Sequence, residues 1–326
     1  MSQRRSALRI GTRGSTLAVW QTEWVRARLR ESGYESERIE IKTLGDLVAD
    51  VPLDRIGSRA LFTKQIDDAL LEGRIDLAVH SFKDLPTQLP EGIAVAAVGQ
   101  REDPRDALVG REALEWGDLP RRGVVATSSL RRRAQILHSR PDLTVVDVRG
   151  NVETRLGKLD NQPSWSGILL AAAGLVRLGL ERRIGERLAP ALMLPAPAQG
   201  ALAVTVRAGD TAAAAAARRA VHHPETALSV AAERGFLRRL EGGCQVPVAA
   251  YAELDEGGGR PSLRLHGRVV SLRGDRMVKG RQAGVAADEN EAAALGSALA
   301  DRLLSEGASE ILVEVRSAVA PTVSEP

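Results

Sequence analysis

The alternation of strand and helix patterns along the first 173 residues constrains the fold of this chain most strongly. Residues 7–11, 37–44 and 75–80 have the pattern of strands, and helical patterns at 16–31 and 62–72 lie between them. This order implies right-handed crossovers and a mostly parallel sheet. Binding sites in such sheets lie where strands end and helices begin.

A second set of elements repeats this order further along the chain. It comprises strands at 123–127, 144–148 and 167–173, with helices at 130–139 and 152–159 between them. The two sets show no convincing sequence repeat, so what they share is the order of their elements. We therefore predict two α/β units.

The rest of the chain predicts a third, smaller domain. A proline-rich segment at 190–197 indicates a linker, and residues 201–207 are expected to return to the first sheet as a strand. A long helical pattern then runs from 210 towards 240. The predicted domains are 1–100 together with 198–220, then 101–197, and finally an α+β domain at 221–326.

The α+β domain is predicted from its alternating pattern. Segments 246–253, 262–271 and 276–282 alternate like antiparallel strands joined by turns. A helix is expected at 288–306, with Asp288 as its N-cap. A last strand is expected at 310–315.

Composition excludes several classes of function. The chain has 45 Lys plus Arg against 42 Asp plus Glu, a net charge of +3, and 44% hydrophobic residues, which is typical of a folded, soluble protein. Aromatic residues make up only 3%, too few for a protein that stacks on bases, so we expect no nucleic-acid partner. The longest apolar stretch, 167–176, is about half of the roughly 20 residues that a membrane span needs, which predicts a cytoplasmic protein without membrane contact.

The single cysteine, Cys244, excludes an internal disulfide and any multi-cysteine metal cluster. His80 has no second ligand at a suitable spacing, so we expect no metal. Cys244 lies on a turn with two glycines between a helix and a strand. A thiol in that place is either a small buried apolar group or a point of covalent attachment.

The segment 127–133 predicts an anion site. Thr127, Ser128 and Ser129 place three hydroxyls at a helix N-terminus, where free N–H groups and the helix dipole favour a negative ligand. Arg131 and Arg132 lie in the first helical turn, where positive charge is unfavourable unless an anion lies between them. The alternative is that both side chains point into solvent.

Two further junctions between a strand and a helix carry arginine. Arg149 ends a strand, Gly150 permits a tight turn, and Arg155 follows one to two helical turns later. Arg13 and Ser15 lie at the first junction of the chain. Three such junctions predict a ligand with several carboxylates or phosphates, which guanidinium groups bind in bidentate fashion. Only five of the 45 basic residues are lysines, a bias that coding preference explains equally well.

Ser81, Lys83 and Asp84 directly follow the apolar strand at 75–80. An aspartate beside a lysine at the carboxyl end of a strand is either a positioned acid or base, or one half of a surface ion pair. The sequence pattern alone leaves both interpretations open.

Six segments spread over nearly the whole chain together resemble the porphobilinogen deaminase family, whose members are also called hydroxymethylbilane synthases. Each segment alone is unspecific, whereas the set in this order is highly specific. The segments are 9–15, 78–84, 101–106, 123–132, 148–155 and 241–247.

The resemblance implies two periplasmic-binding-protein-like α/β domains with a central cleft, plus a small C-terminal α+β domain. It also implies a dipyrromethane cofactor joined by a thioether to Cys244. Four porphobilinogen molecules would be joined head to tail with loss of ammonia, and hydrolysis would free linear hydroxymethylbilane for tetrapyrrole biosynthesis. We expect a monomer whose partner is its small-molecule substrate, porphobilinogen.

The resemblance also assigns roles to individual residues. Asp84 would face the pyrrole N–H groups and act in catalysis. Residues that would hold the cofactor are Cys244, Ser81, Lys83, Thr127, Ser128, Ser129, Arg131, Arg132, Arg149, Gly150 and Arg155. Residues that would hold the substrate are Arg13, Ser15, Arg177, Gln199 and Gly200. A lid loop would carry Arg55, Arg59 and Phe62, with arginine where relatives often have lysine.

Two other functions account for part of the pattern. A non-catalytic, periplasmic-binding-like sensor of small anions would use the arginines but would leave Cys244 and the third domain without a role. A phosphate-transferring enzyme fits less well, because the loop 11–15 lacks the lysine of a Walker motif.

Overall fold

The computed structural model describes residues 7–43, 60–240, 246–255 and 261–319. These residues form two compact units. The first unit takes in the described residues up to Glu102 and then Gly200–Ala227. The second takes in Asp103–Gln199 and the described residues from Leu228 onward.

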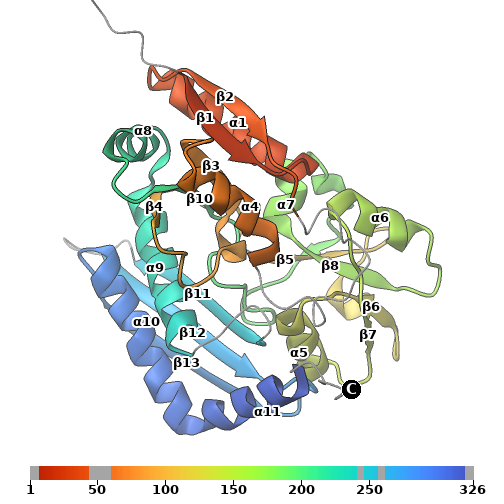
Figure 1. Ribbon diagram of the computed structural model, residues 1–326. Helices are drawn as coiled ribbons and strands as arrows, with labels where there is room; N and C mark the ends of the chain where they lie inside the picture. Colours follow the sequence, from red (N-terminus) through yellow and green to blue (C-terminus); the bar gives the residue numbers. More distant parts are fainter. Residues whose placement is uncertain (1–6, 44–59, 241–245, 256–260, 320–326) are drawn as a thin grey trace, which may run out of the picture. The chain divides into compact units, whose positions relative to one another are not determined.

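The first unit is built on one mixed sheet (Figure 1). Its elements are β1 (Leu8–Thr12), α1 (Thr16–Glu31), β2 (Ser36–Glu40), α4 (Ala60–Leu71), β3 (Leu77–Ser81), the short helix η1 (Phe82–Asp84), β4 (Ile93–Val98), β10 (Leu202–Arg207) and α8 (Thr211–Val221). The strand order is β2-β1-β3-β10-β4, with β10 antiparallel to both of its neighbours. The predicted return of a strand to this sheet is therefore confirmed as β10.

The second unit contains a sheet with the same topology. Its elements are β5 (Asp106–Val109), η2 (Trp116–Asp118), β6 (Val124–Ala126), α5 (Leu130–Ser139), β7 (Thr144–Val146), α6 (Val152–Asp160), β8 (Gly167–Ala171), α7 (Ala172–Arg177), η3 (Glu181–Arg183) and β9 (Glu186–Arg187). The strand order is β7-β6-β8-β5-β9. In each sheet three parallel strands are followed by one strand, β10 or β5, that is antiparallel to both of its neighbours, which confirms two α/β sheets of one architecture.

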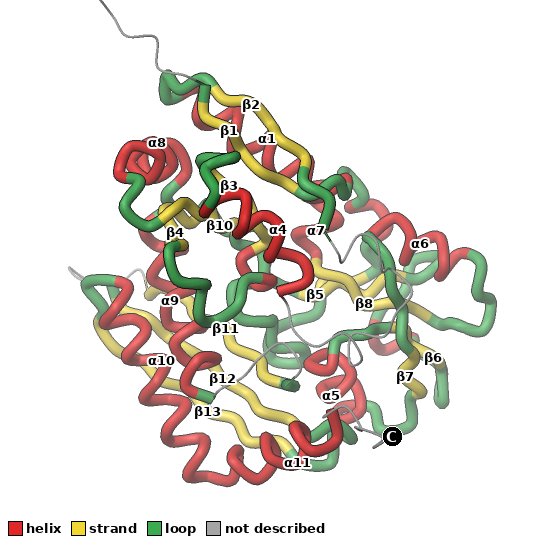
Figure 2. Tube along the Cα trace, in the orientation of Figure 1, coloured by secondary structure: helices red, strands yellow, loops and turns green. Residues whose placement is uncertain are grey.

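The described residues from Pro224 onward form an antiparallel sheet covered by helices (Figure 2), and those from Leu228 belong to the second unit. Its elements are α9 (Pro224–Arg239), β11 (Val248–Asp255), β12 (Ser262–Val270), β13 (Met277–Val285), α10 (Glu289–Leu303), the π-helical turn η4 (Leu304–Ala308) and α11 (Ser309–Val319). Asp288 caps α10 as predicted, because its carboxylate accepts the N–H groups of Asn290 and Glu291. The predicted fold class, α/β with a small α+β domain, is confirmed.

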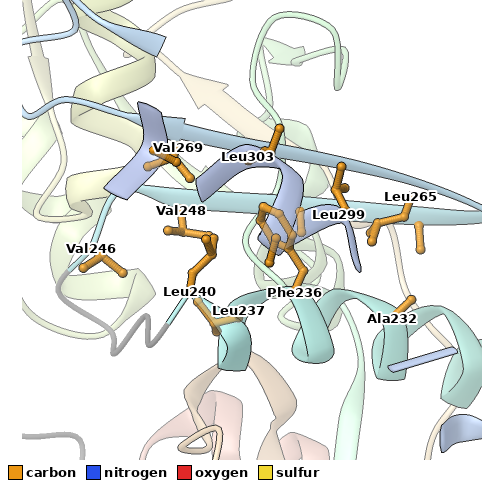
Figure 3. Close-up of a cluster of buried hydrophobic side chains, with 14 of the residues drawn as sticks. Ala232, Phe236, Leu237, Leu240, Val246, Val248, Leu265, Val269, Leu299 and Leu303 are labelled. Atoms are coloured by element: carbon orange, nitrogen blue, oxygen red, sulfur yellow. The ribbon is translucent and has the colours of Figure 1, made fainter. Parts of the chain in front are cut away.

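The core of this α+β part forms where α9 and α10 pack against the sheet (Figure 3). Phe236 on α9 is fully buried beside Leu299 and Leu265. Gly267 on β12 leaves room for the ring, since a Cβ atom there would lie 2.6 Å from Phe236 Cζ. Burying these side chains supplies most of the stabilisation of the domain.

Two predictions about this region are wrong. Residues 310–315 belong to α11 and not to a strand, because Ile311, Leu312 and Val315 are buried at helical spacing. The single helix expected from 210 to 240 is two helices, since the chain leaves α8 at His222, where ψ is 126°, and starts α9 at Pro224. The ring of Pro224 disfavours helical geometry at His223, so α8 does not continue into α9.

Among the helices of the described part, none combines the length and the apolar character that a membrane span requires.

Candidate active site

Two loops at the carboxyl ends of β6 and β7 are joined by one hydroxyl. Ser128 Oγ donates to the carbonyl of Val148 (2.8 Å) and accepts its N–H (3.0 Å). In the same loop, Thr127 Oγ1 accepts the N–H of Ser129 (3.2 Å), and Ser129 caps α5 by accepting the N–H of Arg132 (3.4 Å). The structure thus brings the first two predicted anion loops together.

The backbone of the loop after β7 is held by side chains of the following helix. Gly150 has a φ of +112°, and a Cβ atom there would lie 2.7 Å from Thr154 Cβ. Arg155 Nε donates to the Gly150 carbonyl (2.7 Å), and Lys158 donates to the Arg149 carbonyl (3.2 Å). These bonds fix the backbone from which the half-buried Arg149 side chain projects.

The anion expected between Arg131 and Arg132 is supplied by the protein. Asp106, the first residue of β5, is fully buried, and its carboxylate accepts from Arg131 Nη1 (2.6 Å) and from Arg132 Nη2 (2.7 Å). Both guanidinium groups are themselves buried, so neither arginine points into solvent. Burial alone would raise the pKa of Asp106, but the two arginines hold that pKa well below its usual range.

Gln199 lies against the same carboxylate. Its Nε2 donates to Asp106 Oδ1 (2.9 Å) and to the Pro104 carbonyl (2.7 Å). Arg177, at the end of α7, is also buried in this unit. The structure places Gln199 on the carboxylate that binds the two arginines, a contact that the sequence pattern did not suggest.

Six of the predicted site residues lie in the first unit: Arg13, Ser15, Ser81, Lys83, Asp84 and Gly200. Ser15 caps α1, and Ser81 accepts a hydrogen bond from Gln21 (2.8 Å). Lys83 and Asp84 occupy η1 directly after β3, and Asp84 is exposed. Arg13 is partly buried.

His80 is buried at the end of β3 and contacts Thr205 Oγ1 through Nε2 (3.1 Å). Desolvation lowers its pKa to about 4, with the nearby charge of Arg13 acting in the same direction and that of Asp84 opposing it. His80 is therefore a neutral hydrogen-bonding residue near neutral pH.

Three of the predicted site residues lie outside the described residues: Cys244, Arg55 and Arg59. Phe62 lies in α4, but its side chain is not among those described. Within the described ranges, no three His, Cys, Asp or Glu side chains are grouped closely enough to hold a metal ion.

Two family models match the chain in sequence order. One is described as "Porphobilinogen deaminase, dipyromethane cofactor binding domain" and matches residues 8–215. The other is described as "Porphobilinogen deaminase, C-terminal domain" and matches residues 227–305. The chain belongs to the porphobilinogen deaminase family.

Curated relatives of this family match at nearly full length. Porphobilinogen deaminase of Geotalea uraniireducens is 47% identical over 310 residues, covering 94% of each chain. That of Moorella thermoacetica is 47% identical over 312 residues, covering 95% of this chain and 97% of the relative. Among solved structures, a nutrient-binding protein from Burkholderia cenocepacia bound to methionine has a TM-score of 0.42 at 14% identity, covering 68% of this chain and 93% of that one.

Sequence reasoning gave no role to Asp106 or to Glu233. Each is a charged residue with no exposed surface. The signal for Asp106 is an acidic residue that opens the apolar segment 106–109 between two polar runs. Glu233 offers no such signal, because glutamate on a helix is ordinarily exposed.

Proposed function

We propose that this member of the porphobilinogen deaminase family joins four porphobilinogen molecules head to tail, with loss of one ammonia from each, and that water then releases the chain as hydroxymethylbilane. The observation that carries the proposal is the match of both family domains, in order, together with relatives that are 47% identical over 94% of this chain. A sensor of small anions is not favoured, because such a binding protein needs no C-terminal domain of this family.

The residues of the second unit fit a dipyrromethane cofactor. Its acetate and propionate groups are carboxylates. Ser128 joins the two loops that lead into α5 and α6. Arg131 and Arg132 lie in the first turn of α5, Arg149 in the loop after β7, and Arg155 in α6. Guanidinium groups bind carboxylates in bidentate fashion. We assign these four arginines, with Thr127, Ser128, Ser129, Gly150, Ser81 and Lys83, to the cofactor, and Cys244 to its thioether. When bound, the cofactor supplies the pyrrole end to which the first substrate is joined.

Asp84 is the residue that we assign to catalysis. Asp84 is exposed in the short helix after β3, at the carboxyl end of this central strand, where the binding sites of α/β sheets lie. A carboxylate facing the pyrrole N–H groups stabilises positive charge on the incoming porphobilinogen as ammonia leaves. It can also accept the proton released when the new bond has formed.

We assign Arg13, Ser15, Gly200, Arg177 and Gln199 to the substrate. Arg13 and Ser15 belong to the first junction of the first unit, and Gly200 lies just before β10. Arg177 and Gln199 belong to the second unit. Guanidinium groups such as those of Arg13 and Arg177 bind carboxylates, and each porphobilinogen carries two.

Intact-mass measurement tests the proposal directly. The purified protein should carry a dipyrromethane adduct, which a Cys244→Ser variant should lack, and p-dimethylaminobenzaldehyde should give a coloured product with the native protein only. An unmodified native protein that stays unmodified and inactive after incubation with porphobilinogen would rule the function out.

An Asp84→Asn variant separates catalysis from cofactor binding. We expect it to keep the fold and the adduct but to lose most turnover, about a hundredfold or more for loss of a positioned acid–base group. Near-native turnover would remove Asp84 from the mechanism. We also propose a cytoplasmic monomer, which light scattering of the holoenzyme and cell fractionation would test.

A further inference from the structure

Asp106 gathers five donors from three side chains. Its Oδ1 accepts from Arg132 Nε (2.9 Å) and Nη2 (2.7 Å), from Arg131 Nη2 (3.2 Å) and from Gln199 Nε2 (2.9 Å). Its Oδ2 accepts from Arg131 Nη1 (2.6 Å). A fully buried carboxylate bonded in this way has one orientation and fixes the groups around it.

The helix alone would not aim the two arginines at one point. Arg131 and Arg132 are consecutive residues of α5, so their side chains leave the helix about 100° apart. Asp106 brings both guanidinium groups onto a single carboxylate. Each is held from a second direction as well, Arg131 by the Leu194 carbonyl (2.9 Å) and Arg132 by the Leu169 carbonyl (2.9 Å).

Asp106, Arg131 and Arg132 together also have a fixed net charge. Two buried guanidinium groups and one carboxylate leave a single net positive charge in a place with little access to water. Such a charge attracts one further carboxylate, because unpaired charge in the interior is costly. Without Asp106 the two arginines would carry two positive charges and would attract two carboxylates instead of one.

Asp106 also bonds to the residue at which the chain passes from the second unit back to the first. Gln199 ends the segment Asp103–Gln199 of the second unit, and Glu233, which is buried, accepts the N–H of the preceding Ala198 (2.6 Å). Ala198 has a φ of +63°, a strained value for alanine that these contacts maintain. The position of Gln199 is therefore fixed together with that of the arginines.

We propose that Asp106 is a positioning residue that presents Arg131 and Arg132 as one preformed receptor for a single carboxylate of the cofactor. This inference rests on the proposed function. Asp106 acts through the two arginines and does not itself contact the ligand. Its length and its charge are both required, the first to set the position of the guanidinium groups and the second to set their net charge.

The test measures cofactor loading and not only turnover. Apoprotein of each variant is incubated with porphobilinogen, and the growth of the Cys244 adduct is followed by intact mass. Asp106→Glu keeps the charge and shifts the carboxylate by one methylene, whereas Asp106→Asn keeps the shape and removes the charge. Asp103→Asn is the matched control, because Asp103 also pairs with two arginines, Arg105 and Arg187, outside the predicted site.

We expect loading to slow about tenfold or more in both Asp106 variants, since small displacements of positioning groups have effects of this size or larger. The Asp103 control should stay within about twofold of the native protein by the same reasoning. Native-like loading by Asp106→Glu would overturn the proposal, because charge compensation alone would then suffice. Should only Asp106→Asn fail to fold, Asp106→Glu decides the question; failure of both variants to fold would make Asp106 purely structural and would also overturn it. A native protein that never acquires the adduct would instead refute the proposed function.

Discussion

Replacing Ser128 with alanine should measure how strongly the two anion loops are joined. The Ser128 hydroxyl donates to the Val148 carbonyl and accepts the Val148 N–H, at 2.8 and 3.0 Å. Val148 is only 3% exposed, so water does not readily replace the lost hydroxyl. Alanine therefore leaves one buried donor and one buried acceptor without their partner.

The expected cost follows from those two groups. An unsatisfied buried polar group costs about 1–3 kcal/mol, and the two groups here belong to one residue that can relax as a unit. We expect Ser128→Ala to lower the free energy of unfolding by about 2–3 kcal/mol. Because the loop that carries Arg149 is released, cofactor loading of the apoprotein should also slow.

Urea denaturation, followed by far-UV circular dichroism, measures the stability change. Ser139→Ala is the matched control, because the Ser139 hydroxyl contacts the carbonyls of Gln135 and Ile136 within its own helix. The Ile136 carbonyl also accepts the N–H of Arg140, so this carbonyl keeps a hydrogen bond when the Ser139 hydroxyl is removed. This control should change stability by less than about 0.5 kcal/mol. A Ser128→Ala variant as stable as the Ser139→Ala control would show that this hydroxyl does not hold the two loops together.

Three further predictions follow from buried or strained groups. His80 has a pKa of about 4 in the folded state against 6.5 when unperturbed, so the unfolded chain takes up a proton that the folded one does not as pH falls between these values. Native protein should therefore lose about 3 kcal/mol more than His80→Gln between pH 7 and 4, measured by urea unfolding at each pH, and equal losses would contradict this. Glu233→Gln should lower the free energy of unfolding by about 1–3 kcal/mol in the same assay. The two carboxylate oxygens accept the backbone N–H groups of Ala198 and Ala252, whereas glutamine has one oxygen and can accept only one of them. Gly150→Ala should lower both stability, by about 1–2 kcal/mol, and cofactor loading, since φ is +112° and Thr154 fills the space; an unchanged loading rate would show that the loop tolerates another conformation.

The order of strands and helices along the two α/β sheets could be predicted because each element has its own local periodicity of apolar residues. Each βα unit has an apolar strand, a polar junction and a helical stripe, and the two sheets duly show one topology. Local periodicity failed at 310–315, where a short run of branched apolar residues looks like a strand. Only the packing of Ile311, Leu312 and Val315 onto the core of the α+β part selects the helix.

The positions of the anion loops were predictable for a similar reason, since hydroxyls and arginines follow the ends of strands. The contacts between loops were not. Ser128 and Val148 are 20 residues apart, and nothing in either segment marks the other as its partner. Pairings of this kind depend on the lateral order of strands, which local pattern does not encode.

Asp106 shows what that lateral order adds to the chemistry of the site. Two arginines in the first turn of α5 require an anion, and the sequence pattern identified this need without identifying its source. In the sheet, β5 and β6 lie on either side of β8, so Arg132 reaches past β8, bonding to Leu169 on the way, to meet Asp106. Since this internal carboxylate uses one of the two positive charges, the pair can neutralise only one carboxylate of a ligand. A cofactor with four carboxylates therefore needs further cations, and we assign this role to Arg149 in the loop after β7 and to Arg155 in α6.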